Sequence, residues 1–266
     1  MDNYKYKRTE NAMIENLGIQ LYTLREKMTD EESVKASFKK IKEIGYNHIQ
    51  PANMCNLAPE KFASLAKEAG LSCEKCGTIS AWSQILNDPD ALLATHKAIG
   101  ATNIGIGYMP PEWRDCPESI TKFIDKANEF SKYANSRGFT VGYHNHSFEF
   151  KKVGGVRIMD RLVNELDADF NFVLDTYWVQ HGGGDVRYWI KKLAGRIEVL
   201  HLKDMVMEET QMFAEIGNGN LNWEGIMEEA DKAGIKTYVV EQDTCPGDPF
   251  DSIRMSYDYI TKTFMA

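Results

Sequence analysis

The chain alternates short apolar runs with amphipathic segments, and this alternation restricts its possible folds more than any other feature. The apolar runs span residues 17–22, 46–50, 71–77, 101–107, 139–145, 170–175, 196–202 and 236–242. Segments with helical periodicity follow at residues 30–45, 58–70, 88–100, 118–138, 155–167, 185–195, 222–234 and 248–264. Strands that alternate with helices predict a parallel sheet, because each helix must return the chain to the starting edge.

Eight such units within 266 residues predict an α/β protein of the (β/α)8 TIM barrel type. The connections are short and none is a Pro-, Gly- or Ser-rich linker, so we expect a single domain over residues 17–266. Residues 1–16 are expected to form a flexible leader. A doubly wound open sheet is the alternative fold. No G-x-G-x-x-G follows the first apolar run, so its nucleotide-binding version is not supported.

Charge and composition exclude several classes of protein. With 39 acidic and 31 basic residues the formal net charge is -8, which argues against a nucleic-acid-binding surface. No apolar run is long enough to cross a bilayer, so no membrane partner is expected. The polar start lacks the apolar segment of a signal peptide. We therefore expect a cytoplasmic protein, or a periplasmic one if a signal has been removed, and a homo-oligomer is possible.

The five cysteines are odd in number and scattered, which favours a reducing compartment over a disulfide framework. Cys73 and Cys76 form a C-x-x-C, but no second pair completes a zinc site. Buried thiols are the preferred interpretation, and a redox or zinc role is the alternative.

Acidic and imidazole side chains follow several of the apolar runs directly. Asp175, His201 and Glu241 each come at the end of a run, and His144 and Glu149 come at and just beyond the end of another. Each residue alone has an ordinary explanation as a cap, a core imidazole or an ion-pair partner. In a TIM barrel, however, the carboxyl ends of the strands converge on the active site. Mixed oxygen and nitrogen ligands there predict one divalent ion, Mn²⁺, Mg²⁺, Co²⁺ or Zn²⁺.

The motifs YHNHSFEF, VLDTYW, HLKD, EIGNGNLNW and VVEQD occur in the order seen in the xylose isomerase-like TIM barrel superfamily. The chain resembles in particular its sugar phosphate isomerase/epimerase branch, which includes inosose dehydratase-like lyases. The resemblance extends from about Leu17 to the end and implies Asp175, His201 and Glu241 as metal ligands. Gly142 stands where ketose 3-epimerases carry a glutamate, so Glu149 is the expected fourth ligand. His144 or His146 is the alternative, and either would shift the preference towards zinc.

The resemblance also implies a reaction, namely isomerisation or epimerisation of a sugar or sugar-like hydroxy-carbonyl compound through a metal-stabilised enediolate. Glu149 and Glu241 are the expected proton carriers, Lys203 would polarise or protonate a substrate oxygen, and His146 would border the substrate. A lyase, a dehydratase or hydratase of a keto-inositol or 3-keto-sugar, is the alternative. A non-catalytic sugar-binding barrel is the third hypothesis.

Residues at other strand ends are candidates for substrate binding. They are Gln20, Tyr22, His144, Trp178 and His181. Trp178 stands where ketose 3-epimerases carry a histidine, and it could stack on the apolar face of a sugar ring. The glycine-rich loop at 215–223 is expected to approach the metal and the substrate. Because Arg and Lys do not cluster at strand ends, a non-phosphorylated sugar, keto-sugar or cyclitol is at least as plausible as a sugar phosphate.

Overall fold

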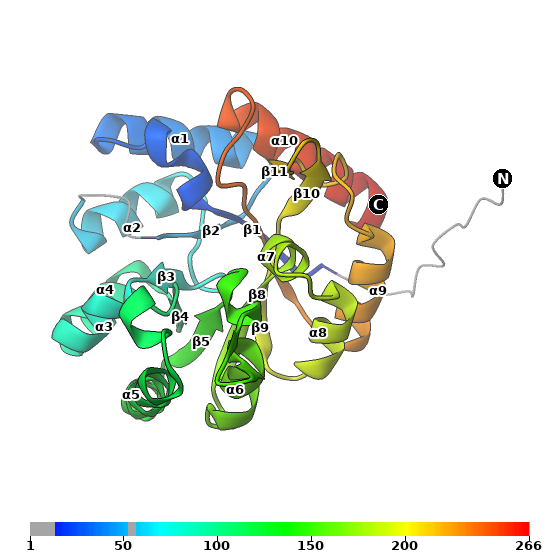
Figure 1. The fold of residues 1–266 in the computed structure, drawn as a ribbon. Helices are drawn as coiled ribbons and strands as arrows, with labels where there is room; N and C mark the ends of the chain where they lie inside the picture. Colours follow the sequence, from blue (N-terminus) through cyan, green and yellow to red (C-terminus); the bar gives the residue numbers. More distant parts are fainter. Residues whose placement is uncertain (1–13, 53–56, 266) are drawn as a thin grey trace, which may run out of the picture.

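The computed structural model describes residues 14–52 and 57–265 and confirms the predicted barrel. Eight parallel strands lie in the order β2-β1-β12-β9-β8-β5-β4-β3 (Figure 1). They are β1 (Asn16–Gln20), β2 (His48–Gln50), β3 (Thr78–Ser80), β4 (Asn103–Ile106), β5 (Thr140–His144), β8 (Asn171–Asp175), β9 (Ile197–Leu202) and β12 (Thr237–Val240). Between β2 and β3 a bridge from His48 to Ser72 and the hydrogen bond from Ile79 N to Pro51 O nearly close the barrel.

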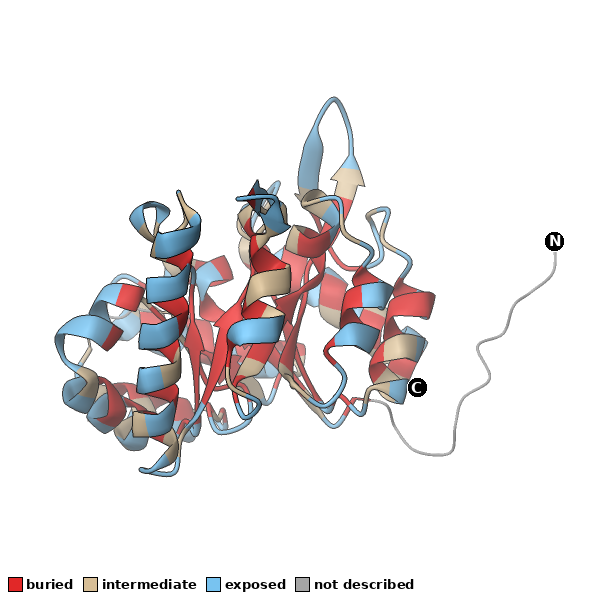
Figure 2. Cartoon of the chain, turned by 60° about the horizontal axis from the view of Figure 1, so that its bottom comes forward, coloured by how far each residue is buried: buried red, intermediate tan, exposed pale blue. Residues whose placement is uncertain are grey.

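Helices surround these strands, and their inner faces are buried against the sheet (Figures 1 and 2). They are α1 (Glu31–Ile44), α2 (Pro59–Glu68), α3 (Trp82–Asn87), α4 (Pro89–Ile99), α5 (Pro117–Asn135), α6 (Ile158–Glu165), α7 (Thr176–His181), α8 (Val186–Lys192), α9 (Trp223–Lys232) and α10 (Pro249–Ile260). The other helical segments are the 3₁₀ helices η1 (Leu21–Lys27), η2 (Pro111–Trp113) and η3 (Phe148–Phe150) and the π-helix η4 (Thr261–Met265).

Helix α1 shows how the sequence sets these boundaries. The Asp30 side chain accepts a hydrogen bond from Ser33 N at 2.8 Å, while the Ser33 hydroxyl accepts one from Asp30 N, which forms a capping box. Phe38 and Ile41 lie three residues apart on the buried face. The helix ends at Gly45, whose φ of 128° is costly for any residue with a Cβ atom.

The structure differs from the sequence prediction in some elements. The third strand is not at 71–77: this segment forms a turn after the Ser72 bridge, and the strand β3 begins at Thr78. Cys73 and Cys76 are buried, and neither forms a disulfide. Two hairpins were not predicted, β6 (Lys152–Val153) with β7 (Val156–Arg157) and β10 (Asp204–Met207) with β11 (Gln211–Ala214). Most of the expected leader, residues 1–13, lies outside the described residues, and β1 begins at Asn16.

A layer of small apolar side chains supports the site from below. Val173, Val199 and Val239 form a separate buried cluster with Cys76. Each valine precedes a polar residue by two positions, and alternate residues of a strand share a face. Asp175, His201 and Glu241 therefore stand directly above this layer. Gly18 is required there because a Cβ atom would come within 2.4 Å of the Cys76 sulfur.

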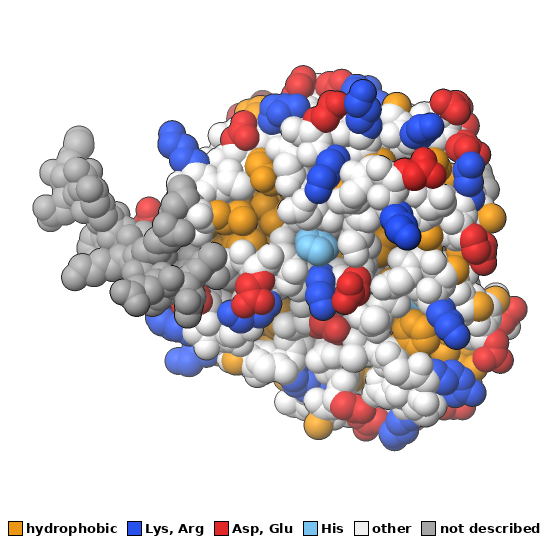
Figure 3. Space-filling model, turned by 180° about the vertical axis from the view of Figure 1, so that it is seen from behind, with side chains coloured by type: hydrophobic (Ala, Val, Ile, Leu, Met, Phe, Trp, Pro, Cys, Tyr) orange, Lys and Arg blue, Asp and Glu red, His pale blue; other side chains and the backbone are white. Residues whose placement is uncertain are grey.

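The outer surface carries charges of both signs. On the face seen in Figure 3, lysines and arginines are interspersed with aspartates and glutamates. Within residues 14–52 and 57–265, the structure has no helix with the length and hydropathy needed to cross a bilayer.

Candidate metal centre and active-site cavity

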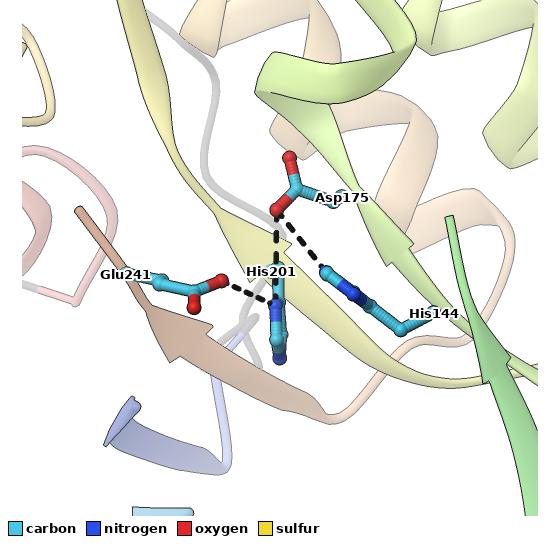
Figure 4. A group of neighbouring side chains, drawn as sticks. All are labelled: His144, Asp175, His201 and Glu241. Carbon is cyan, nitrogen blue, oxygen red and sulfur yellow. Dashed lines mark hydrogen bonds and ion pairs between the residues drawn. The ribbon is translucent and has the colours of Figure 1, made fainter. Parts of the chain in front are cut away.

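Four buried side chains converge at the carboxyl ends of neighbouring strands. His144 ends β5, Asp175 ends β8, His201 lies near the end of β9 and Glu241 directly follows β12 (Figure 4). One ligand atom from each residue lies within 4.8 Å of the corresponding atoms of the others. Two imidazoles and two carboxylates form a donor set that suits a divalent transition metal or Mg²⁺.

The candidate ligand atoms of these four residues face one another at the centre of the group. Asp175 Oδ2 lies 3.4 Å from His144 Nε2 and 3.8 Å from His201 Nδ1. His201 Nδ1 lies 3.0 Å from Glu241 Oε2, yet neither atom makes a hydrogen bond of good geometry. Buried polar atoms without such bonds are costly, and a shared cation would satisfy both. The residues present therefore fit a metal ion.

Each imidazole is oriented from behind by a hydrogen-bond acceptor. His144 Nδ1 lies 3.1 Å from Gly107 O, and His201 Nε2 lies 2.7 Å from Gln50 Oε1. A carbonyl oxygen only accepts, so these nitrogens carry the hydrogens. With a cation at the centre, His144 Nε2 and His201 Nδ1 would then be the lone-pair donors, as metal-binding histidines require.

Asp175 is held in the same way. Its Oδ1 accepts a hydrogen bond from Trp178 N at 2.9 Å, and its own N–H donates to Asn145 Oδ1 at 2.9 Å. Asp175 is thus the N-cap of α7, which is the ordinary role of an aspartate after a strand. Its other oxygen, Oδ2, faces the centre, so Asp175 can cap the helix and contribute to the ligand group at the same time.

Glu149, the expected fourth ligand, lies outside this group. It is fully buried, and its two oxygens accept hydrogen bonds from the Tyr143 hydroxyl at 2.5 Å and from His146 N at 2.8 Å. The structure places His144 in the fourth position instead, one of the two alternatives that the sequence left open. The reason is geometric: His144 still belongs to the strand, whereas the turn that follows carries Glu149 behind it.

Burial raises the pKa of Glu149 from 4.5 to about 7, although its hydrogen bonds with Tyr143 and His146 partly oppose the shift. Between these two values the folded protein binds a proton at this carboxyl that the unfolded chain does not bind. The stabilisation is complete below pH 4.5 and is lost as the pH rises through about 7.

Relative to the Glu149→Gln variant, wild-type protein should lose about 3 kcal/mol of unfolding free energy as the pH rises from 4.5 to above 7. Urea unfolding of both metal-free proteins between pH 4.5 and 8 measures this, and a pH-independent difference would contradict it.

Lys203 places a cation inside the same group. Its ammonium lies 3.1 Å from Asp175 Oδ2, 2.9 Å from Glu241 Oε2 and 2.9 Å from Asp243 Oδ1. Burial alone would lower the pKa of Lys203, but these three carboxylates outweigh burial and raise it. Burial would likewise raise the pKa of Glu241, and the Lys203 ammonium holds it below its usual range. Lys203 is therefore protonated and Glu241 ionised at neutral pH.

Asp243 was missed by sequence reasoning. It follows Glu241 by two residues in the motif VVEQD, and this spacing was the available signal. Its side chain is 23% exposed and lies beside the Lys203 ammonium at the wall of the cavity.

A cavity of about 300 Å³ opens above the metal-ligand group. Tyr22, Tyr108 and Trp178 contribute aromatic rings to its wall, and the His146 ring centroid lies 5.3 Å from those of both Phe148 and Trp178. Burial lowers the pKa of His146 well below its usual value, so its ring is neutral. The lining residues are Gln20, Tyr22, Ala52, Ile79, Ser80, Ala81, Gly107, Tyr108, His144, His146, Trp178, Lys203, Glu241 and Asp243.

Most of the residues predicted from the sequence line this cavity, but Asp175, His201, Glu149, His181 and the glycine-rich loop do not. His181 packs against Tyr177 and is not among the lining residues. The glycine-rich loop at 215–223 does not line the cavity either. Its backbone N–H groups at Gly217 and Gly219 donate to Asp204 Oδ2, so the loop is built around that carboxylate. Gln20 lines the cavity and also donates to Gln50 Oε1 at 2.6 Å, behind His201.

Comparison with known proteins agrees with this fold. The sequence profile of the xylose isomerase-like TIM barrel family matches residues 38–260. An inosose dehydratase of Mesomycoplasma hyopneumoniae is 22% identical over 182 residues, which cover 58% of this chain and 59% of that protein. The match thus spans less than two thirds of that relative.

Two solved structures are similar over nearly the whole chain. A sugar phosphate isomerase/epimerase from Parabacteroides distasonis has a TM-score of 0.78 at 19% identity, with 98% of each chain covered. A xylose isomerase-like TIM barrel protein from Mycobacterium smegmatis, in complex with magnesium, has a TM-score of 0.72 at 14% identity, with 96% of this chain and 98% of that chain covered. At these identities the likeness shows the fold. Because the profile covers most of its length, the chain belongs to the xylose isomerase-like TIM barrel family.

Proposed function

We propose that this protein is a divalent-metal-dependent sugar isomerase that works with one carboxylate base and one ammonium acid. His144, Asp175, His201 and Glu241 would hold the metal. When bound, the ion supplies a Lewis acid that makes the carbon next to a carbonyl group more acidic. The observation that carries the proposal is the side-by-side placement of Glu241, Lys203 and these ligands at the floor of one cavity.

Glu241 is the proposed base. It is ionised and lines the cavity, and because its Oε2 faces Lys203 and His201, its other oxygen, Oε1, would take the substrate proton. Glu149, the other proton carrier expected from the sequence, has both oxygens bonded and does not line the cavity. Epimerisation that uses Glu149 and Glu241 on opposite faces is therefore less well supported than chemistry with a single base.

Lys203 is the proposed acid. Its three carboxylate partners keep it charged, and it lines the cavity beside Trp178, with its nitrogen 5.5 Å from that ring's centroid. A charged ammonium can donate a hydrogen bond to a substrate oxygen or give it a proton. Asp243 accepts from the same ammonium and is partly exposed, so it would relay a proton from solvent to Lys203 after each transfer.

The substrate is proposed to be a neutral sugar or cyclitol. Among the described lining residues Lys203 is the one cation, and it already faces three carboxylates. Residues 53–56, which lie outside the described residues, add no Lys or Arg. Apart from the proposed metal ion, a phosphate group would therefore find no cation in this wall that carboxylates do not already contact. The aromatic wall suits the apolar face of a polyhydroxylated ring.

A lyase is the second candidate, and the same acid–base pair favours it. Elimination of water needs one base to remove a proton and one acid to protonate the departing hydroxyl, which Glu241 and Lys203 could provide. The 22% identity to an inosose dehydratase points in the same direction.

Incubation of metal-loaded protein with keto-sugars and cyclitols in deuterated water tests both candidates. The isomerase is expected to incorporate deuterium without loss of water, and EDTA is expected to stop the incorporation. Appearance of an enone absorbance would instead identify the lyase. Deuterium incorporation that EDTA does not change, or none with any neutral substrate, would contradict the proposed function.

A further inference from the structure

Glu149 is a buried carboxyl that the proposed reaction does not use. Its side chain is 0% exposed, and among the described residues no Lys, Arg or His forms an ion pair with it. A carboxyl in such a position costs free energy, because burial without a counter-ion disfavours its charged form. Its contacts must therefore serve the fold or the site.

The contacts of Glu149 tie two loops together. Its Oε1 accepts the hydrogen bond from the Tyr143 hydroxyl at 2.5 Å, and the Tyr143 oxygen in turn accepts one from Met109 N at 2.9 Å. Its Oε2 accepts from His146 N at 2.8 Å. The loop after β4 and the loop after β5 are thus bound to a single buried pair, Glu149 and Tyr143.

The loop after β4 contains the group that orients a metal-ligand candidate. Gly107, two residues before Met109, accepts from His144 Nδ1 at 3.1 Å through its carbonyl oxygen. Its own N–H donates to Ser80 O at 2.9 Å, so residues 107–109 are held at one end by β3 and at the other by Tyr143. The position of the Gly107 oxygen therefore depends on the Glu149–Tyr143 pair.

We propose that Glu149 is a positioning residue for the metal centre: through Tyr143 and Met109 it fixes the Gly107 carbonyl, which holds His144 with Nε2 towards the cation. The inference rests on the metal-dependent function proposed above. It gives Glu149 a place behind the centre instead of among its ligands. Residues that orient a metal-binding histidine typically contribute about 10–100-fold to metal affinity.

Glu149→Gln is the sharpest variant, because an amide has the same shape but one acceptor oxygen in place of two. Either the Tyr143 hydroxyl or His146 N then loses its acceptor. The affinity of the variant for Co²⁺, measured by calorimetry, is expected to fall about 10-fold or more. Tyr143→Phe should produce a similar loss. Two controls alter polar groups elsewhere: Glu198→Gln, which keeps one acceptor oxygen for its bonds with Thr140 and Asn171, and Tyr46→Phe, which loses its bond to Ile253 O. Both should bind Co²⁺ as the wild type does.

A double-mutant cycle separates positioning from direct ligation. If Glu149 acts through His144, the double variant His144→Ala/Glu149→Gln should bind Co²⁺ within about twofold of His144→Ala alone. If the two losses add, Glu149 contributes independently and the inference is overturned. Unchanged Co²⁺ affinity in Glu149→Gln overturns it as well.

A second readout needs neither metal nor substrate. In metal-free protein with ¹⁵N-labelled histidines, nitrogen chemical shifts should show the His144 hydrogen on Nδ1 in the wild type and in Glu198→Gln. The tautomers should be mixed in Glu149→Gln. An unaltered tautomer would refute positioning through Gly107. The Co²⁺-affinity and tautomer tests do not depend on the proton-exchange assay. A protein that passes both tests but shows no proton exchange would disprove the proposed reaction and leave the positioning role of Glu149 standing.

Discussion

Replacement of Asp175 by alanine is expected to lower metal affinity by at least about 100-fold and to abolish metal-dependent proton exchange. Its Oδ2 faces His144, His201 and Lys203 together, so its loss removes a ligand atom and leaves the Lys203 ammonium with two partners in place of three. Calorimetry with Mn²⁺ or Co²⁺ and the deuterium-incorporation assay measure the two effects.

Asp175 is also a helix cap, so a matched control must separate the two roles. Asp185→Ala removes the N-cap of α8, where Asp185 accepts from Arg187 N at 2.9 Å, and leaves the centre intact. This control should lose about 1 kcal/mol of unfolding free energy and keep its metal affinity. If Asp175→Ala behaved like Asp185→Ala, the carboxylate would be a cap only and the metal site would be refuted.

Lys203→Met should separate metal binding from catalysis. Methionine preserves the length of the side chain but cannot donate a proton, so the rate of substrate proton exchange is expected to fall about 10²–10⁴-fold. Metal affinity should stay the same or rise, because the ammonium contacts Asp175 Oδ2 and Glu241 Oε2, the oxygens that a cation would use. Parallel measurements of turnover and of metal binding test this.

Lys192→Met is the control for Lys203→Met. Lys192 forms an ion pair with Asp160 at 2.6 Å on the outside of the barrel, and its loss should change neither quantity. A Lys203→Met variant that turned over at the wild-type rate would exclude Lys203 as the acid. One that lost metal affinity more than tenfold would instead make Lys203 a structural support of the centre.

The barrel and three of the four residues at its centre could be predicted because both follow from periodicity. Strands buried on both faces read as apolar runs, and the first polar residue after each run must lie at the carboxyl end. Asp175, His201 and Glu241 all occupy that position. The third strand was misplaced because Leu71, Cys73 and Cys76 are buried like strand residues, although residues 71–77 turn back before β3 begins.

The fourth position depends on a turn, and the sequence does not specify the path of that turn. His144 ends strand β5, and Glu149 comes five residues later. Only the structure shows that the turn at 145–147 carries Glu149 behind the strand. Asp243 was missed for a similar reason, because strand alternation ends at Val240 and gives no direction for the residues beyond it. The roles of Gly107 and Gln50 come from contacts between residues far apart in the sequence, at 37 and 151 positions from the histidines they orient.

The most direct test of the central claim is the anomalous diffraction of crystals grown with Mn²⁺. One strong peak is expected at the mouth of the barrel, within bonding distance of His144 Nε2, Asp175 Oδ2, His201 Nδ1 and Glu241 Oε2. A peak ligated by Glu149 with His144 turned away, or no peak among these four side chains, would contradict it.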